Sequence, residues 1–374
     1  MILTLSFLLL MYCFLIGMFV LGFEKISIND TLNATPETQF SIIISFRNEA
    51  ENLPNLLQSL SALNYTEKLF EIIFVDDASE DASEEIIQNF MTESSLTISL
   101  IKNTRVSASP KKDAITKAIK GAKFKWIVTT DADCQVNKNW LLALDACIQK
   151  ETPYLVAGPV KYVGKKSKLH QYQVLDSLSL TTVAIGGFGL HKPLLVNGAN
   201  LAYKKSIFSE LNGFSGNDEV ASGDDIFMLQ KIYKAYPNKI SYIKSKNAVV
   251  ITKPENTWAA VISQRIRWAS KTKNYNNSFS KTTGILVFVT NFCLLILLLF
   301  ILVLPLPWWF FIFFISFKII IDFIAIARSA IFLKQYTSLF FYPFSVVIYP
   351  ILSTYIVFAS LWGNYKWKGR AFKK

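Results

Sequence analysis

The chain has 374 residues and a formal net charge of +12 at pH 7, and 52% of its residues are hydrophobic. Its 4 cysteines have no close spacing, and its 2 histidines are too few for a histidine metal cluster, which argues against a disulfide framework, a zinc site or an HExxH centre. Any divalent metal must therefore be held by carboxylates. No nucleic-acid-binding motif stands out, and basic side chains beside apolar segments suit a membrane surface, so we expect no nucleic-acid partner.

The N-terminal run "MILTLSFLLLMYCFLIGMFVLGF" carries no charge before Glu24. About 20 apolar residues are enough to cross a bilayer as a helix. A cleaved signal peptide is the alternative interpretation, but the run lacks the basic start and the small-residue cleavage site of such a peptide. We expect residues 1–23 to form an uncleaved transmembrane anchor.

Residues 24–253 have the composition of a soluble domain and alternate between strand and helix patterns. Unbroken apolar, β-branched runs predict strands, and each is followed by apolar residues at helical spacing. This order favours an α/β fold in which a mostly parallel, Rossmann-like sheet has helices on both faces. The expected strands cover residues 40–46, 70–81, 96–102 and 124–133.

Polar residues follow three of these strands, in "SFRNE" (45–49), "VDDAS" (75–79) and "TDADC" (130–134). In parallel sheets, ligands bind beyond the carboxyl ends of the strands. We therefore expect the three segments to converge on one cleft.

Asp131 and Asp133 are one residue apart, so both side chains can turn toward one ligand. Hard oxygen ligands suit Mg²⁺ or Mn²⁺, with a diphosphate completing the coordination shell. A solvated turn with two acids is the alternative. Asp76 and Asp77 end another strand, where a carboxylate can accept hydrogen bonds from a nucleobase N–H or a ribose hydroxyl.

Two further segments carry charge at helix ends. Lys111 and Lys112 open a helix, where N–H groups and ammonium charges favour an anion; an exposed basic face is the alternative. Asp224 and Asp225 open the helix in "SGDDIF", where acids are also sensible as a cap and first-turn residues without any catalytic role.

The segment "PENTWAAVISQRIRWASKTK" (254–273) reads as an amphipathic helix that starts at Pro254. Gln264, Arg267 and Trp268 fall on one face of it. An amide, a guanidinium and an indole suit a sugar and a diphosphate. A basic helix lying on a membrane is the alternative, and both interpretations can hold together. We assign residues 254–282 to this interface helix.

Residues 283–363 are expected to form the C-terminal membrane helices. Runs at 284–304 and 308–327 are separated by the "PLP" at 305–307, and a third run at 339–362 is interrupted by prolines. If residues 24–253 face the cytoplasm, three full spans after them would place the basic tail, residues 364–374, outside the cell. That would go against the positive-inside tendency. We therefore expect the third run to be re-entrant or interfacial.

Lys318 and Asp322 lie four residues apart within the second of these runs. Charges in a membrane often mark function. A mutually neutralising pair that faces a neighbouring helix is an equally good interpretation.

The motifs together resemble those of membrane-bound family 2 glycosyltransferases of the GT-A fold, which include cellulose and hyaluronan synthases and ceramide glucosyltransferase-like enzymes. The resemblance covers roughly residues 39 to 275, and the membrane segments match as well. Six motifs in the same order carry it: "SIIISFRNEAENL", "EIIFVDDASED", "PKKDAITKAI", "TTDADC", "SGDDIF" and "QRIRW".

The resemblance implies a role for each acid. Asp77, with Asp76, would contact the nucleoside of a sugar nucleotide, usually UDP. Asp131 and Asp133 match the D-x-D motif that touches ribose and coordinates the metal. Asp225 matches the last acid of a "TED" or "EDD" motif, the general base.

The resemblance also assigns the remaining polar groups. Lys111 matches the Lys of a "GK" pair, and Arg47 and Glu49 are assigned to the nucleotide-sugar site. Asp224 completes the catalytic acid pair. Gln264, Arg267 and Trp268 match Q-x-x-R-W, near the acceptor and the diphosphate. The chain departs from the family pattern at Pro110, where Gly is usual, and in having "GDD" for "TED".

The expected function is inverting hexosyl transfer from a nucleotide sugar to a hydroxyl of a lipid or lipid-linked acceptor, with Mg²⁺ or Mn²⁺. Alternatives are a processive polysaccharide synthase, with a saccharide acceptor, and a non-catalytic nucleotide-sugar-binding membrane protein. The resemblance implies an integral protein of a bacterial inner membrane with its catalytic domain in the cytoplasm.

Overall fold

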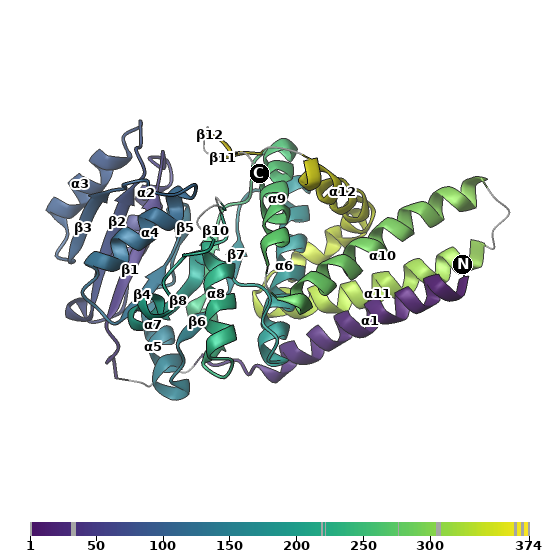
Figure 1. The fold of residues 1–374 in the computed structure, drawn as a ribbon, viewed down its shortest axis with the longest axis horizontal. Coiled ribbons are helices and arrows are strands. Elements are labelled where there is room, and N and C mark those ends of the chain that lie inside the picture. The colour runs from purple at the N-terminus through teal and green to yellow at the C-terminus, as the bar shows by residue number, and fades with distance from the viewer. Residues whose placement is uncertain are drawn as a thin grey trace.

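The computed structural model describes residues 2–30, 35–217, 220, 222–275, 277–303, 308–362, 365–367 and 370–372. An α/β domain lies at one end of the molecule and a bundle of long apolar helices at the other (Figure 1). Two helices, α6 (Lys168–Gly189) and α9 (Trp258–Ser270), lie between them.

A seven-stranded sheet forms the centre of the α/β domain in the described residues, with the strand order β3-β2-β1-β4-β8-β6-β9. Its neighbours pair in parallel except for β8, which runs antiparallel to β4 and β6. The expected mostly parallel sheet is therefore confirmed. Its strands are β1 (Phe40–Phe46), β2 (Phe70–Asp76), β3 (Ile98–Lys102), β4 (Trp126–Thr129), β6 (Leu155–Ala157), β8 (Leu201–Lys204) and β9 (Ile240–Tyr242).

Helices cover both faces of this sheet because successive strand residues point to opposite sides. Ile43 belongs to one buried cluster, together with Ala114 of helix α4. Its neighbour Ile42 belongs to another, together with Leu56 of helix α2. Both faces are thus apolar, which explains the unbroken hydrophobic runs of β1 and β2. The helices around the sheet are α2 (Leu53–Ser61), α3 (Ser83–Glu93), α4 (Pro110–Gly121), α5 (Trp140–Glu151), α7 (Lys205–Glu210) and α8 (Asp224–Ala235).

The remaining strands of the described residues form two smaller sheets. β5 (Cys134–Gln135) pairs antiparallel with β10 (Val250–Thr252), which pairs in parallel with β7 (Val160–Tyr162). The last strands are β11 (Tyr365–Trp367) and β12 (Arg370–Phe372), which pair antiparallel. β10 leads the chain out of the domain toward α9.

Helix α9 starts later than expected. It begins at Trp258 rather than at Pro254, because the hydroxyl of Thr257 caps it by accepting the N–H of Ala260 at 3.2 Å. The prediction of a start at Pro254 is therefore wrong. The residues before the cap form a loop, and that loop reaches the cavity described below.

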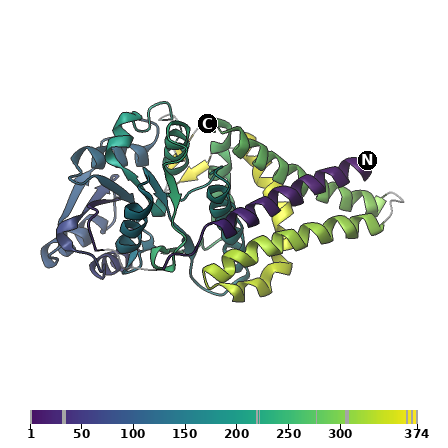
Figure 2. The ribbon, with the colours of Figure 1, turned by 90° about the horizontal axis from the view of Figure 1, so that it is seen from below.

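Helix α6 joins the α/β domain to the helix α1 (Ile2–Lys25) through glycines. A Cβ atom on Gly189 would lie 1.9 Å from the carbonyl oxygen of Gly22, and one on Gly186 would lie 2.2 Å from that of Phe19. Only glycine permits so close an approach of the two backbones. Figure 2 shows α1, in purple, reaching the α/β domain at its C-terminal end and extending from there along the other apolar helices.

Four helical segments of the described chain are long and apolar enough to cross a membrane: Ile2–Lys25, Ser278–Ile301, Trp308–Phe332 and Tyr336–Leu361. The first three belong to α1, α10 (Ser278–Val303) and α11 (Trp308–Phe332), and the fourth combines the short helix η5 (Tyr336–Phe341) with α12 (Tyr342–Trp362). The break expected at 305–307 lies outside the described residues.

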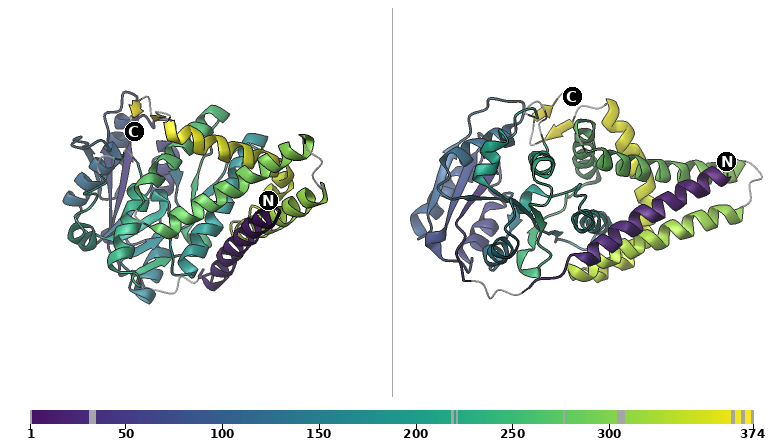
Figure 3. Two further views of the ribbon diagram at one scale, coloured as in Figure 1. Left: turned by 45° about the vertical axis from the view of Figure 1, so that its right-hand side comes forward. Right: turned by 60° about the horizontal axis from the view of Figure 1, so that its bottom comes forward.

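Helix α12 differs from the other three in direction. Helices α1, α10 and α11 run side by side away from the α/β domain, whereas α12 crosses them steeply (Figures 2 and 3). It packs against both α9 and α10. This orientation agrees with an interfacial placement of the third C-terminal run, which stays a prediction.

The charged pair inside α11 faces a neighbouring helix. Lys318 Nζ lies 2.7 Å from Asp322 Oδ2, and the hydroxyl of Tyr12 in α1 donates to Asp322 Oδ1 at 2.7 Å. The interpretation of a mutually neutralising pair is therefore confirmed. The pair joins α11 to α1.

Candidate active site

One cavity of about 750 Å³ lies between the carboxyl edge of the sheet and helices α6 and α9. Its lining joins segments that are far apart in the sequence, so the expected convergence of strand ends is confirmed. The predicted site residues that line it are Arg47, Glu49, Asp77, Lys111, Asp131, Asp133, Asp224, Asp225, Gln264, Arg267 and Trp268.

Asp76 is the one predicted site residue outside this lining. Its side chain is buried, and Oδ1 accepts the backbone N–H of Ser79 at 2.9 Å. Asp76 therefore shapes the turn after β2, and its neighbour Asp77 is the acid that reaches the cavity.

The end of the cavity near β2 and β3 is organised around Asp77. Its Oδ1 accepts the Nε–H of Arg105 at 2.8 Å and the side-chain amide of Asn103 at 2.9 Å. Arg47 donates to the carbonyl oxygen of Asp77 at 3.0 Å. Glu49 accepts the amide of Asn52 at 2.7 Å, at the start of α2. Arg47 thus joins the loops after β1 and β2, and Arg105 and Asn103 join the loop after β3 to the loop after β2.

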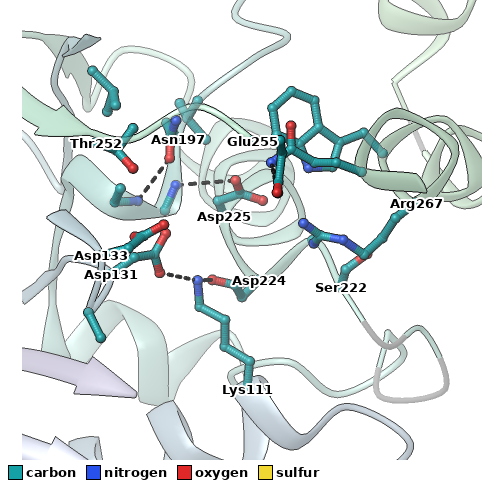
Figure 4. Close-up of a pocket in the computed structure, with 18 of the residues that line it drawn as sticks. Lys111, Asp131, Asp133, Asn197, Ser222, Asp224, Asp225, Thr252, Glu255 and Arg267 are labelled. Carbon is teal, nitrogen blue, oxygen red and sulfur yellow. Dashed lines mark hydrogen bonds and ion pairs between the residues drawn. The ribbon is translucent and has the colours of Figure 1, made fainter. Parts of the chain in front are cut away.

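Lys111 lies between the D-x-D motif and the acids of α8. Its Nζ donates to Asp131 Oδ1 at 2.7 Å and lies 3.5 Å from Asp224 Oδ2 (Figure 4). Burial by itself lowers the pKa of Lys111, but the charges of Asp131 and Asp224 outweigh it and the pKa is raised. Lys111 is therefore a fixed cation at all physiological pH values.

Lys112, the neighbouring residue, points elsewhere. Its Nζ donates to the carbonyl oxygens of Asn217 and Val220 at 2.5 and 2.7 Å, and its side chain is buried. An exposed basic face at Lys111 and Lys112 is therefore wrong. Lys112 holds the loop before α8, whereas Lys111 faces the cavity.

The acid pair of α8 follows Gly223, whose φ of 89° lies in the left-handed region that favours glycine. Asp225 Oδ2 accepts the backbone N–H of Gly198 at 3.2 Å, and Oδ1 accepts that of Ile226 at 2.7 Å. The carboxylate is thus held by backbone donors at the cavity wall. Burial, opposed by Lys111, raises the pKa of Asp224.

Helix α9 contributes a polar face and a buried ion pair. Gln264 Nε2 donates to Glu255 Oε1 at 3.0 Å, and Arg267 is directed into the cavity (Figure 4). Trp268 packs on the guanidinium of Arg265, with 4.1 Å between the guanidinium carbon and the ring centroid. Arg265 pairs with Asp176 of α6 at 2.5 Å.

Several cavity residues were not predicted. Glu255 is held by α6, since its N–H donates to Gln173 Oε1 at 2.8 Å and its carbonyl accepts Gln173 Nε2 at 2.9 Å. Arg265 and Lys271 also line the cavity. Lys271 follows Arg267 by four residues, a spacing that could have revealed it; nothing in the sequence marks Glu255.

The carboxylates of the D-x-D motif fit a divalent cation that has few protein ligands. Asp131 and Asp133 lie side by side at the cavity (Figure 4). The described part of the chain holds no group of three or more His, Cys, Asp or Glu side chains suited to a metal. Mg²⁺ and its analogues need only one or two carboxylates when phosphate oxygens supply further ligands.

Comparison with known proteins identifies the domain that carries this cavity. Residues 41–211 match the profile of the family described as Glycosyl transferase family 2. The chain therefore carries a family 2 glycosyltransferase domain, and the resemblance drawn from the motifs is confirmed. Asp225 and α9 lie beyond the matched residues.

A solved structure shares the fold over almost the whole chain. It is the mannosyltransferase PcManGT from Pyrobaculum calidifontis, in complex with GDP-Man and Mn²⁺, with a TM-score of 0.59 and 16% sequence identity. The match covers 96% of this chain and 98% of that one. The α/β domain is therefore a GT-A domain.

Curated relatives match over a shorter region. A poly-beta-1,6-N-acetyl-D-glucosamine synthase of Staphylococcus epidermidis is 25% identical over 232 residues, which cover 61% of this chain and 53% of the relative. The probable glycosyltransferase YdaM of Bacillus subtilis is 24% identical over 234 residues, 61% of this chain and 54% of the relative. The chain thus spans about half the length of these relatives.

Proposed function

We propose that the protein is an inverting membrane glycosyltransferase, which moves a hexose from a nucleotide sugar, with UDP as the expected nucleotide, to a hydroxyl of a lipid or lipid-linked acceptor. One observation carries the proposal: Asp77, the D-x-D pair and Asp225 line a single cavity. Sugar transfer needs these acids in one place, because they would contact the donor's nucleoside, the donor's diphosphate and the acceptor's hydroxyl.

The donor would lie along the strand ends. Asp77, fixed by Arg105 and Asn103, offers a carboxylate for the nucleoside. Asp131 and Asp133 would hold Mg²⁺ or Mn²⁺, and a mannosyltransferase of the same fold was solved with GDP-Man and Mn²⁺. Such an ion neutralises charge that develops on a departing diphosphate. Arg267 adds fixed positive charge to the same region.

Asp225 would act as the general base. Its carboxylate is held at the cavity wall by the N–H groups of Gly198 and Ile226, so its position is fixed before the acceptor arrives. It would take the proton of the acceptor hydroxyl as that oxygen bonds to the anomeric carbon and the diphosphate leaves. A single displacement inverts that carbon. General-base catalysis contributes about 10²–10⁴ in rate.

The acceptor would come from the membrane. The cavity is walled by α6 and α9, and these helices pack against α1 and α12. A hydroxyl on a lipid could therefore reach Asp225 from the bilayer surface. A processive polysaccharide synthase is the second candidate, because a relative carries the name of a poly-beta-1,6-N-acetyl-D-glucosamine synthase.

The proposed orientation of the protein in the membrane follows from the location of the donor. Sugar nucleotides are cytosolic, so residues 24–253 would face the cytoplasm of a bacterial cell. Residues 1–23 and 283–363 would hold the protein in the inner membrane, and residues 254–282 would lie at its surface. Labelling of single cysteines introduced into the basic tail, in intact and in opened cells, tests the tail's side of the membrane.

Membranes that contain the protein, incubated with radiolabelled UDP-sugars, test the function. Label that extracts into organic solvent supports a lipid acceptor, and label that stays in an insoluble polymer supports the synthase. No incorporation from any UDP- or GDP-sugar, with donor binding intact, would favour a non-catalytic protein.

The proposed metal has its own test. EDTA should stop incorporation, and added Mg²⁺ or Mn²⁺ should restore it. Without a metal ion, the two negative carboxylates would repel the negative diphosphate. Full activity in EDTA would contradict a metal at Asp131 and Asp133.

A further inference from the structure

Lys271 is a cavity residue to which the proposed mechanism gives no task. It begins the short helix η4 (Lys271–Asn274), which follows α9, and only 9% of its surface is exposed. The structure records an ion pair between its Nζ and Asp225 Oδ1 at 3.9 Å. That separation is too long for a hydrogen bond.

The aliphatic part of Lys271 is held against the start of α8. A Cβ atom on Gly223 would lie 3.1 Å from Cδ of Lys271, so a larger residue there would press on the lysine. The absence of a side chain at Gly223 lets the lysine stem run past the helix start. The ammonium group thereby reaches Asp225, the second acid of the pair.

The two cavity lysines are unequally neutralised. Lys111 has Asp131 at 2.7 Å and Asp224 at 3.5 Å, whereas Lys271 has Asp225 at 3.9 Å. Burial lowers the pKa of Lys271, and the nearby charge of Arg267 lowers it further, so that Asp225 offsets these effects only in part. The surroundings of Lys271 therefore favour an additional anion.

We propose that Lys271 binds the terminal phosphate of the donor's diphosphate together with Arg267, and leaves Asp225 when the donor arrives. The inference rests on the proposed function. Lys271 and Arg267 lie four residues apart, about one helical turn, so both can reach one diphosphate. The movement frees Asp225 Oδ1 from its cation, and the base is then available to the acceptor hydroxyl only once the donor is bound.

Nucleotide binding to the purified full-length protein in detergent tests this inference without turnover. The probes are UDP, GDP, UMP and GMP, measured by calorimetry with Mg²⁺ present. A hydrogen bond to a charged group contributes about 1.5–3 kcal/mol, so Lys271→Met should weaken binding of the preferred diphosphate by roughly tenfold or more. Binding of the matching monophosphate should change by less than about twofold, because it lacks the phosphate that Lys271 contacts.

Two variants control for charge and for folding. Lys271→Arg keeps the cation and should retain most of the diphosphate affinity. Lys234→Met removes an exposed lysine from the far end of α8 and should bind both nucleotides as the wild type does. Each variant's thermal unfolding midpoint reports whether it is folded.

The outcomes separate the inference from the proposed function. A wild-type protein that binds none of the four nucleotides would overturn both. Wild-type binding of a diphosphate, with equal affinity in Lys271→Met, would leave the function standing and overturn the role of Lys271. An equal loss of monophosphate and diphosphate affinity would assign Lys271 to cavity structure and overturn the inference as well.

Discussion

The two walls of the cavity are built in different ways. The sheet-side wall consists of acids that directly follow strands, namely Asp77, Asp131 and Asp133. The membrane-side wall consists of α6, α9 and η4. Arg265 of α9 pairs with Asp176 of α6, and Gln173 of α6 binds the backbone of Glu255 in the loop before α9. The first wall depends on strand order alone, whereas the second depends on how helices pack between the α/β domain and the apolar bundle. Substitutions in the two walls should therefore have different effects on catalysis, substrate affinity and stability.

The acid at the meeting point of the two walls should give the largest effect. Asp225→Asn removes the proposed base but keeps the shape of the side chain, so the transfer rate should fall by about 10²–10⁴. Donor binding should stay within about twofold, because the base acts on the acceptor.

Turnover and nucleotide affinity of Asp225→Asn, measured on the same preparation, check this prediction. Near-normal transfer would remove the general base from Asp225. Loss of both transfer and binding would show that the residue belongs to the donor site instead.

The sequence predicts the sheet-side wall because a strand's carboxyl end is a fixed place in an α/β sheet. Asp77, Asp131 and Asp133 were all located in this way. The sequence does not show which of Asp76 and Asp77 faces the cavity, because the local turn decides which of two adjacent acids points inward. The antiparallel strand β8 and helix α6 were not predicted. Helix α6 is buried on opposite faces by different neighbours, so its sequence has no single apolar face.

The membrane-side wall depends on tertiary contacts that no local pattern encodes. Glu255 reaches the cavity only because Gln173, 82 residues earlier, binds its backbone. Trp268 lines the cavity and also packs on Arg265. Lys112 has the same local pattern as Lys111, yet it binds loop carbonyls.

Breaking the buried pair of the membrane-side wall should give the next largest effect. Arg265→Met leaves Asp176 buried without its partner, which typically costs about 3–5 kcal/mol. The thermal unfolding midpoint in detergent should fall, and the KM values for donor and acceptor should both rise, because α9, which carries Arg267, loses its attachment to α6.

The double variant Arg265→Met, Asp176→Leu provides the control, because it replaces both charges by apolar groups. It should recover much of the lost stability. An unchanged midpoint in Arg265→Met alone would contradict a structural role for the pair. Unchanged KM values alongside a lowered midpoint would show that the pair stabilises the fold without positioning α9 at the cavity.

Tight packing between α6 and α1 should have a smaller effect. Gly186→Ala places a methyl group 2.2 Å from the carbonyl oxygen of Phe19, so the two helices must move apart. Overpacking of this kind costs about 1–3 kcal/mol. The unfolding midpoint should fall, with the donor KM unchanged.

Gly17→Ala is the matched control, because a Cβ atom on Gly17 would have no other atom within 4 Å. It should be neutral or slightly stabilising, since Ala favours a helix over Gly. Equal midpoints for the Gly186 and Gly17 variants would show that α1 and α6 are loosely packed in the membrane.

The smallest effect should come from the rim of the sheet-side wall. Arg105 pairs with Asp77 at 2.8 Å, but 40% of its side chain is exposed. Exposed ion pairs contribute little, so Arg105→Met should raise the donor KM only about two- to fivefold. Asp77→Asn should raise it more, because Asp77 is the group that reaches the cavity. If Arg105→Met had the larger effect of the two, the nucleoside would be read by the arginine, and the sheet-side wall would then depend on a loop residue rather than on the end of β2.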